Sequence, residues 1–137
     1  MKNKALIAEI EAEGIGMMSE LPDKSAYQRM IQRGGKLFYN AQAVVFIAIK
    51  DGEENVYAKV DLGIVAQNIS LAAASLGIDN CHCGMAAFCF LGGKADEFKT
   101  KLGFPDGFIC NYAVLLGYGK AQGVPHAPDK SKITFTA

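Results

Sequence analysis

Hydrophobic and polar residues follow several distinct patterns along the chain, and the first of them is helical. Near the N-terminus, apolar residues fall on one side of a segment rich in Glu and Lys, which predicts a surface helix ending at Gly14 and Gly16. Apolar residues return at helical spacing after Pro22, which suits the first turn of a helix, and Gly34 and Gly35 end this pattern. The first 35 residues are therefore expected to be helical.

A long helical pattern lies between two short runs without polar residues. The runs over residues 43–49 and 113–116 each predict a strand buried on both faces. Residues 57–76 have helical spacing, with Gly77 as the expected stop. Small residues allow a second helix to approach closely, so this is either a buried central helix or one that crosses its twin in a dimer. Its expected apolar stripe consists of Val65, Ile69, Ala72 and Leu76.

The rest of the chain predicts a loop, a short helix, an arm and a final strand. Residues 78–84 are expected to form a cysteine-containing loop, and residues 95–102 an amphipathic helix. The polar residues 120–132 predict an arm, and the alternation over residues 133–136 predicts an edge strand. This order indicates an α+β fold in a single domain (1–137), with a small central antiparallel or mixed sheet flanked by helices.

Composition and charge narrow the class of protein. Half of the residues are hydrophobic and 14 Lys and Arg balance 14 Asp and Glu, so the chain is globular and no nucleic-acid partner is expected. The longest apolar stretches are too short or too interrupted to cross a bilayer, so no membrane association is expected. Acidic residues from Glu9 to Glu13 interrupt any signal-peptide core, which indicates a cytoplasmic protein with reduced thiols.

The most unusual local chemistry is the cluster Cys81-His82-Cys83, followed by Cys89. These are ligand types that zinc prefers, but the one-residue spacing differs from the CxxC pairs of common structural sites. The sequence also lacks the common phosphate-binding loops and the Gly-x-Ser-x-Gly element of Ser-His-Asp hydrolases. No metal site and no catalytic side chain are predicted, and a small zinc protein is kept as an alternative.

Two further features suit a ligand that has a flat ring and a phosphate. Gly84 follows the cysteine cluster, and a glycine lets the main chain approach a planar ligand while leaving its N–H free to donate. Lys130 and Lys132 occupy alternate positions of an arm expected to be extended, so that both point the same way and can grip one phosphate. Two solvated lysines near a terminus explain the second pattern equally well.

Five segments, in order and with compatible spacing, resemble the nitroreductase family over roughly residues 36–136. Each segment is similar to a particular part of the family pattern. They are residues 38–47 (entry to the first strand), 61–73 (central dimer helix), 76–84 (flavin loop), 102–118 (a turn and the following strand) and 130–132 (basic pair before the last strand).

The resemblance implies a homodimeric FMN enzyme with the flavin at the subunit interface. Such an enzyme takes hydride from NAD(P)H and passes electrons to nitroaromatics, quinones or related small-molecule acceptors. It implies that residues 81–84 bind the flavin ring, with a main-chain N–H of Cys83 or Gly84 near flavin N5 and O4. Lys130 and Lys132 would hold the phosphate. Because the flavin would carry the chemistry, no catalytic side chain is expected.

The N-terminal part departs from the family pattern. The family's Arg-Arg-Ser-x-Arg segment, which binds FMN, has no counterpart, because the chain has only Arg29 and Arg33. Residues 1–35 are interpreted as a divergent helical N-terminus, and residues 36–137 as the family-like core and C-terminal arm. The chain is thus interpreted as a shortened member or as part of a longer one. A flavin-free dimeric binding protein of the same fold is the alternative function.

Overall fold

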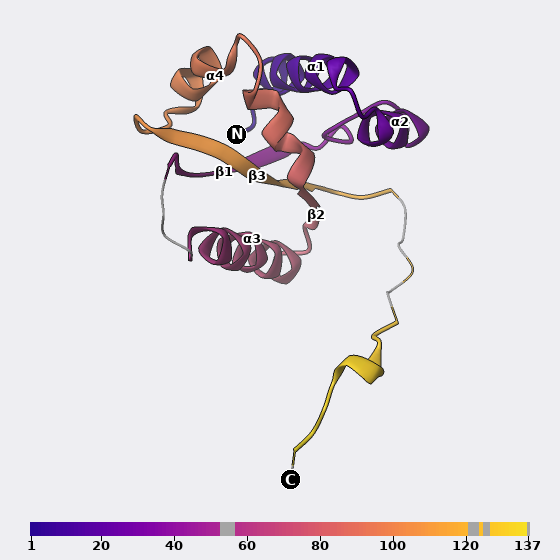
Figure 1. The fold of residues 1–137 in the computed structure, drawn as a ribbon. Coiled ribbons are helices and arrows are strands. Elements are labelled where there is room, and N and C mark those ends of the chain that lie inside the picture. Colours follow the sequence, from indigo (N-terminus) through magenta and orange to yellow (C-terminus); the bar gives the residue numbers. More distant parts are fainter. Residues whose placement is uncertain (53–56, 121–123, 125–126, 137) are drawn as a thin grey trace.

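A computed structural model describes residues 1–52, 57–120, 124 and 127–136 (Figure 1). Helices and strands alternate along most of this length, and the helices outnumber the strands. In chain order the elements are α1 (Lys4–Glu20), α2 (Ser25–Gln32), β1 (Ala43–Lys50), α3 (Ala58–Ser75), β2 (Asp79–Cys83), the 3₁₀ helix η1 (Gly84–Phe90), α4 (Ala95–Leu102), β3 (Phe108–Gly117) and the 3₁₀ turn η2 (Lys130–Lys132).

The three strands form one antiparallel sheet in the order β1-β3-β2. Figure 1 shows α3 alone on one face of this sheet, while α1, α4 and η1 cover the other face. The arrangement is the predicted α+β fold, and the sheet is antiparallel rather than mixed. Because β3 is central, both of its neighbours are edge strands, and β2 is the shorter of the two.

A bulge in β3 sets which side chains enter the core. Ile47 of β1 pairs with Tyr112, but the next residue, Ala48, pairs with Cys110, so Asn111 has no partner in β1. One extra residue changes the alternation of side chains between the two faces of a strand. The Cys110 side chain therefore lies in the core together with that of Ala113.

Phe90 of η1 is the centre of an aromatic cluster in this core. Its ring centroid lies 5.6 Å from that of Phe46 on β1 and 5.7 Å from that of Phe104. Phe38 packs on Phe46, and Phe98 of α4 packs on Phe90. The side chains of Phe38 and Phe98 are fully buried. Offset and edge-to-face aromatic pairs contribute beyond their buried area, so this cluster ties η1 and α4 to the sheet.

The predicted end of the first helix is wrong. α1 continues through Gly14 and Gly16 to Glu20. Gly14 sits where α1 crosses η1, and a Cβ built on it would lie only 2.4 Å from Cys89 Sγ. This glycine is therefore a point of close approach between two elements, not a stop signal. The second helix begins at Ser25, so Pro22 precedes it rather than occupying its first turn.

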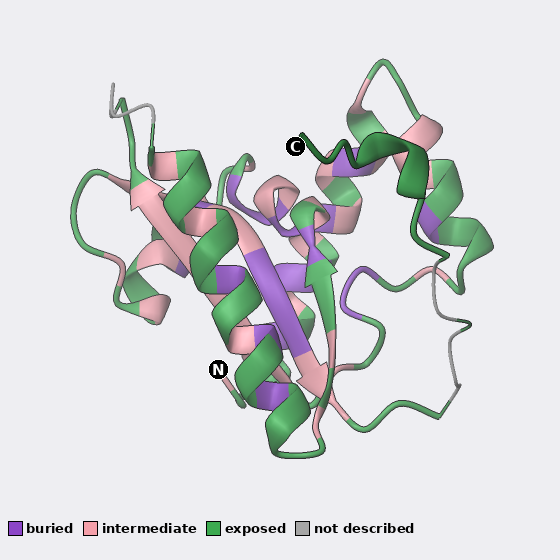
Figure 2. Cartoon of the chain, turned by 90° about the horizontal axis from the view of Figure 1, so that it is seen from below, coloured by how far each residue is buried: buried purple, intermediate pink, exposed green. Residues whose placement is uncertain are grey.

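The long helix has the predicted length but buries a different stripe. The buried residues of α3 are Ala66, Ser70 and Ala73. Each of them follows directly after a residue of the expected stripe. Val65 and Leu76 of the expected stripe are 44% and 73% exposed. Seen from the side that α3 covers, this helix is largely exposed along its outer face (Figure 2). Small side chains therefore face the sheet, and larger apolar ones face outward.

Two predictions near the C-terminal half also differ from the structure. Most of the expected cysteine loop is strand β2, which pairs with β3 from Asp79 to Cys83. Residues 133–136 form no strand, and Figure 1 shows the arm that carries them standing away from the rest of the chain. A strand needs a neighbour for its main-chain hydrogen bonds, and the arm meets none there in a single chain. Residues 121–123, 125–126 and 137 of the expected arm and strand lie outside the described residues.

Candidate flavin-binding site

The predicted ring-binding residues lie together at the end of edge strand β2. Cys81 and His82 are exposed, Cys83 is buried, and Gly84 is the exposed first residue of η1. Successive side chains of a strand point to opposite faces of a sheet. Cys83 accordingly belongs to the core on the α1 face, whereas His82 turns toward α3.

His82 is held by contacts from two other elements. Its Nε2 atom lies 2.7 Å from Ser70 Oγ of α3, which is a short hydrogen bond. Its ring also packs edge-on against Tyr112 of β3, with 5.8 Å between the centroids. Asn80, on the same face of β2, donates from Nδ2 to the Ser70 carbonyl oxygen at 3.4 Å. The end of β2 is therefore attached to α3 as well as to β3.

The three buried cysteines are inert thiols. Burial raises the pKa of Cys83 to about 11, and the main-chain N–H groups of Ala86 and Met85 oppose this only in part. Burial likewise raises the pKa of Cys110 to about 12 and raises that of Cys89. The thiolate is the form that binds metals and attacks electrophiles, so these side chains are protected from both reactions at neutral pH.

The zinc alternative finds no ligand set in the described part of the chain. His82 and Cys83 point to opposite faces of β2, so the sequence cluster is divided by the strand geometry. No group of three or more His, Cys, Asp and Glu side chains there is arranged to hold a metal ion.

Gly84 leaves the main chain uncovered at the point where β2 passes into η1. A Cβ built on this glycine would lie 3.4 Å from Cε2 of Tyr112, so any side chain would fill the space beside that ring. An exposed main chain next to an aromatic wall, at the end of an edge strand, suits the edge of a flat ring. On this observation the residues present fit the ring of a flavin.

The two predicted phosphate ligands lie elsewhere. Lys130 and Lys132 are exposed on η2, where the Asp129 side chain accepts hydrogen bonds from Ser131 and lies 3.9 Å from Lys132 Nζ. The arm was expected to be extended here, and that prediction is wrong. In a 3₁₀ turn of three residues per turn, positions two apart do not share a side. Figure 1 also places η2 far from β2, so one chain does not bring the lysines to the ring-binding residues.

Asp79 connects the start of β2 to the point where the chain leaves β3 toward the arm. This residue starts β2, and its Oδ2 accepts a hydrogen bond of 2.7 Å from the main-chain N–H of Gly119, just after the end of β3. The interaction fixes the direction in which the chain leaves the sheet toward the arm.

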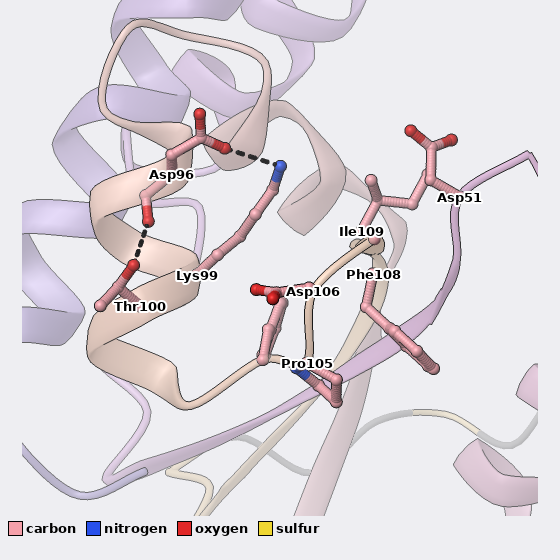
Figure 3. Close-up of a pocket in the computed structure, with 10 residues that line it drawn as sticks. Asp51, Asp96, Lys99, Thr100, Pro105, Asp106, Phe108 and Ile109 are labelled. Atoms are coloured by element: carbon pink, nitrogen blue, oxygen red, sulfur yellow. Dashed lines mark hydrogen bonds and ion pairs between the residues drawn. The ribbon is translucent and has the colours of Figure 1, made fainter.

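Two surface cavities lie away from all of these residues. One, of about 230 Å³, is bordered by α4 and the turn before β3 (Figure 3). Two of its charged lining residues form an ion pair, in which Lys99 Nζ lies 3.0 Å from Asp96 Oδ1. The other, of about 440 Å³, lies beside β1 and the N-terminal residue Met1. Neither is lined by Cys81–Gly84 or by the two lysines.

Sequence reasoning did not find Ser70, Asp79 or Tyr112. Ser70 lies one position beyond Ile69 of the expected stripe, and only the structure shows that it is the single polar residue among the buried positions of α3. A polar side chain on an otherwise apolar helix stripe needs a hydrogen-bond partner. The partner, His82, becomes known only when β2 is placed against β3.

Comparison with known proteins identifies the class. The sequence profile of the nitroreductase family matches residues 2–118, so the chain belongs to the nitroreductase family. This match confirms the resemblance predicted from the sequence. Members of the family are NAD(P)H-dependent flavin oxidoreductases, so the predicted enzyme class is confirmed as well. No match was found among curated proteins. None of the helices in the described ranges has the length and apolar character needed to cross a membrane.

Solved structures agree with this assignment. An FMN-bound nitroreductase from Desulfitobacterium hafniense DCB-2 is 44% identical, with a TM-score of 0.93 over 100% of this chain and 73% of its own. An FMN-bound nitroreductase from Bacteroides fragilis NCTC 9343 has the same fold, at 22% identity and a TM-score of 0.86 over 100% and 73% of the two chains. The NfnB nitroreductase of Mycobacterium smegmatis, solved with NADPH, has a TM-score of 0.59 at 20% identity over 98% and 60%.

Proposed function

We propose that this protein is an FMN-dependent oxidoreductase that transfers hydride from NAD(P)H to nitroaromatics, quinones or related small-molecule acceptors. The observation that carries the proposal is the similarity to the FMN-bound D. hafniense nitroreductase, at 44% identity across the whole of this chain. Identity of this degree, together with a TM-score of 0.93, supports a common cofactor as well as a common fold.

The main chain of Cys81–Gly84 is the part proposed to face the ring. When bound, FMN supplies the redox centre that accepts hydride from a nicotinamide and delivers it to the acceptor. A main-chain N–H of Cys83 or Gly84 would donate a hydrogen bond to the ring edge and stabilise negative charge there. Donors fixed by a sheet need no reorganisation and no titratable side chain, which agrees with the inert thiols of the adjacent core.

A second copy of the chain is proposed to complete the site. Lys130 and Lys132 are exposed cations on an arm that stands away from its own β2. The outer face of α3 carries exposed apolar side chains among polar ones, with Val60, Ile64 and Leu71 all more than half exposed. Burial of such a face against a twin would bring a partner's arm within reach of this chain, and a C₂ dimer would build two equal sites. In this arrangement the two lysines hold the FMN phosphate.

The first test is the visible absorption spectrum of purified protein after addition of FMN and desalting. We expect retained flavin whose band is bleached by NADH or NADPH and restored by a quinone or nitroaromatic acceptor. Failure to retain flavin at high protein concentration would contradict the proposal and favour the flavin-free alternative.

Substitution of the lysines tests the phosphate assignment. Lys130→Ala and Lys132→Ala each remove a charge-assisted hydrogen bond, so FMN affinity should fall by about tenfold or more in a fluorescence titration. Lys4→Ala, at an exposed lysine of α1, is the matched control and should leave affinity unchanged. Equal affinities for all four proteins would show that the phosphate lies elsewhere.

A further inference from the structure

The hydrogen bond between Ser70 and His82 joins the long helix to the end of the edge strand. Its length is 2.7 Å, and Ser70 is only 8% exposed, so water competes poorly for the serine hydroxyl. On its other side the imidazole packs against Tyr112 at an interplanar angle of 67°. The His82 ring is thus fixed at one nitrogen by α3 and along its side by β3.

The same tyrosine borders the flavin-facing main chain. Tyr112 carbons are the nearest atoms to a Cβ built on Gly84, and Tyr112 also contacts the His82 ring. His82 lies one residue before Cys83 and two before Gly84. Displacement of the imidazole would therefore loosen the segment that carries the main-chain N–H proposed to meet the ring edge.

β2 is a short edge strand, so its contacts with α3 add to the few main-chain hydrogen bonds that hold it. β2 has five residues and pairs only with β3 among the described strands, so its outer main-chain edge has no strand beside it. Short edge strands have fewer main-chain hydrogen bonds to hold them in place than central ones. Beyond the pairing with β3, α3 holds this strand through two side chains, those of His82 and Asn80, and both meet α3 at Ser70.

We propose that His82 is a positioning residue, which Ser70 and Tyr112 lock in place so that the main chain of Cys81–Gly84 is held for the flavin ring. The inference rests on the function proposed above. His82 acts through the segment it supports, and its Nε2 atom is engaged by Ser70.

The test begins with flavin-free protein, where the support itself is observable. Ser70→Ala should change the ¹⁵N resonance of His82 Nε2 and speed exchange of the β2 amides that pair with β3 by about tenfold. Ser75→Ala is the matched control, because the Ser75 hydroxyl donates only to the Ala72 carbonyl of its own helix. Unchanged exchange in Ser70→Ala would overturn the inference whether or not the protein binds FMN.

A second experiment measures how the Ser70–His82 contact affects the binding and the midpoint potential of FMN. Ser70→Ala and His82→Leu should each raise the dissociation constant of FMN about tenfold and move its midpoint potential to more negative values, because donors to the reduced ring are misplaced. His82→Gln keeps a hydrogen-bonding group for Ser70 and should restore both quantities in part.

A purely structural role gives a different result. In that case the variants would lower stability to urea but leave both the FMN dissociation constant and the potential at wild-type values, and the inference would be wrong. Wild-type protein that binds no FMN would instead contradict the proposed function, and the exchange rates would still decide the role of His82.

Discussion

Two glycines of α1 show how much the meaning of a residue depends on what it faces. Gly14 and Gly16 are two positions apart and both looked like helix stops, yet the helix passes through both. Gly14 is buried against Cys89 of η1, whereas a Cβ on Gly16 would meet nothing within 4 Å. The first is required by packing and the second only weakens the helix.

Alanine at these positions should therefore act in opposite directions. Gly14→Ala forces Cys89 and η1 to shift, and overpacking of this kind costs about 1–3 kcal/mol. Gly16→Ala should increase stability by about 0.5–1 kcal/mol, because alanine restricts the unfolded chain and favours helix. Urea unfolding of the two variants measures both effects, and a loss of stability in both would contradict the distinction.

The thiols differ as sharply as the glycines. Cys81 is exposed, while Cys83, Cys89 and Cys110 are buried and have raised pKa values. A raised pKa means that the thiolate forms only at higher pH, so at pH 8 about one Cys83 side chain in a thousand is ionised.

One thiol, that of Cys81, should react rapidly with a chromogenic disulfide at pH 8, and all four should react in denaturant. Saturating FMN should slow the rapid reaction, and Cys81→Ser should abolish it; rapid modification of two or more native thiols would contradict this assignment.

At the scale of elements, the patterns with strong periodicity were the predictable ones. The strand over residues 43–49 and the helices over 57–76 and 95–102 all appear within one or two residues of their expected bounds. β2 was missed because its sequence, Asp79–Cys83, is polar and short, and its pairing with β3 depends on the whole sheet. The buried stripe of α3 was misplaced by one residue because the sheet selects Ala66, Ser70 and Ala73 for their small size rather than their hydrophobicity.

The candidate site was predictable only as a set of segments. Cys81–Gly84 could be recognised from local sequence, since a glycine after a cysteine cluster is a local feature. The contacts of His82 with Ser70 and Tyr112 could not, because they depend on how α3, β2 and β3 pack together. The polar sequence of residues 120–132 predicts an extended arm, but Asp129 favours a turn at Lys130–Lys132 by accepting hydrogen bonds from Ser131.

The contact between β2 and the start of the arm gives a prediction at this scale. Asp79→Ala removes the acceptor of the Gly119 N–H, so amide exchange at Gly119 should become about tenfold faster. The contact is exposed, so the free energy of unfolding should fall by less than about 1 kcal/mol. Asp79→Asn keeps an oxygen acceptor and serves as the control. A Gly119 amide that is already unprotected in the wild-type protein would show that the contact does not hold the arm.

At the scale of the whole molecule, the proposed dimer would account both for the exposed apolar side chains of α3 and for the arm that stands away from its own sheet. Ile64→Glu places a charge in the middle of the exposed α3 face, where Ile64 is 53% exposed, and should convert dimer to monomer in light scattering. Ile31→Glu, at a 48% exposed residue of α2, is the matched control and should leave the mass unchanged. A wild-type protein that is monomeric at all concentrations would contradict the proposed dimer.

The arm that stands away from its own sheet has a consequence for how the enzyme would respond to dilution. A site assembled from two chains couples cofactor binding to self-association, so each process strengthens the other. Flavin occupancy would then depend on protein concentration even at a fixed excess of FMN. When dimers are scarce, the concentration of flavin-bound dimer would rise with the square of the monomer concentration, and the fraction of occupied chains would rise in proportion to it. Such a protein is an active holoenzyme in a crowded cell and a flavin-free monomer in a dilute assay, with no change in its fold.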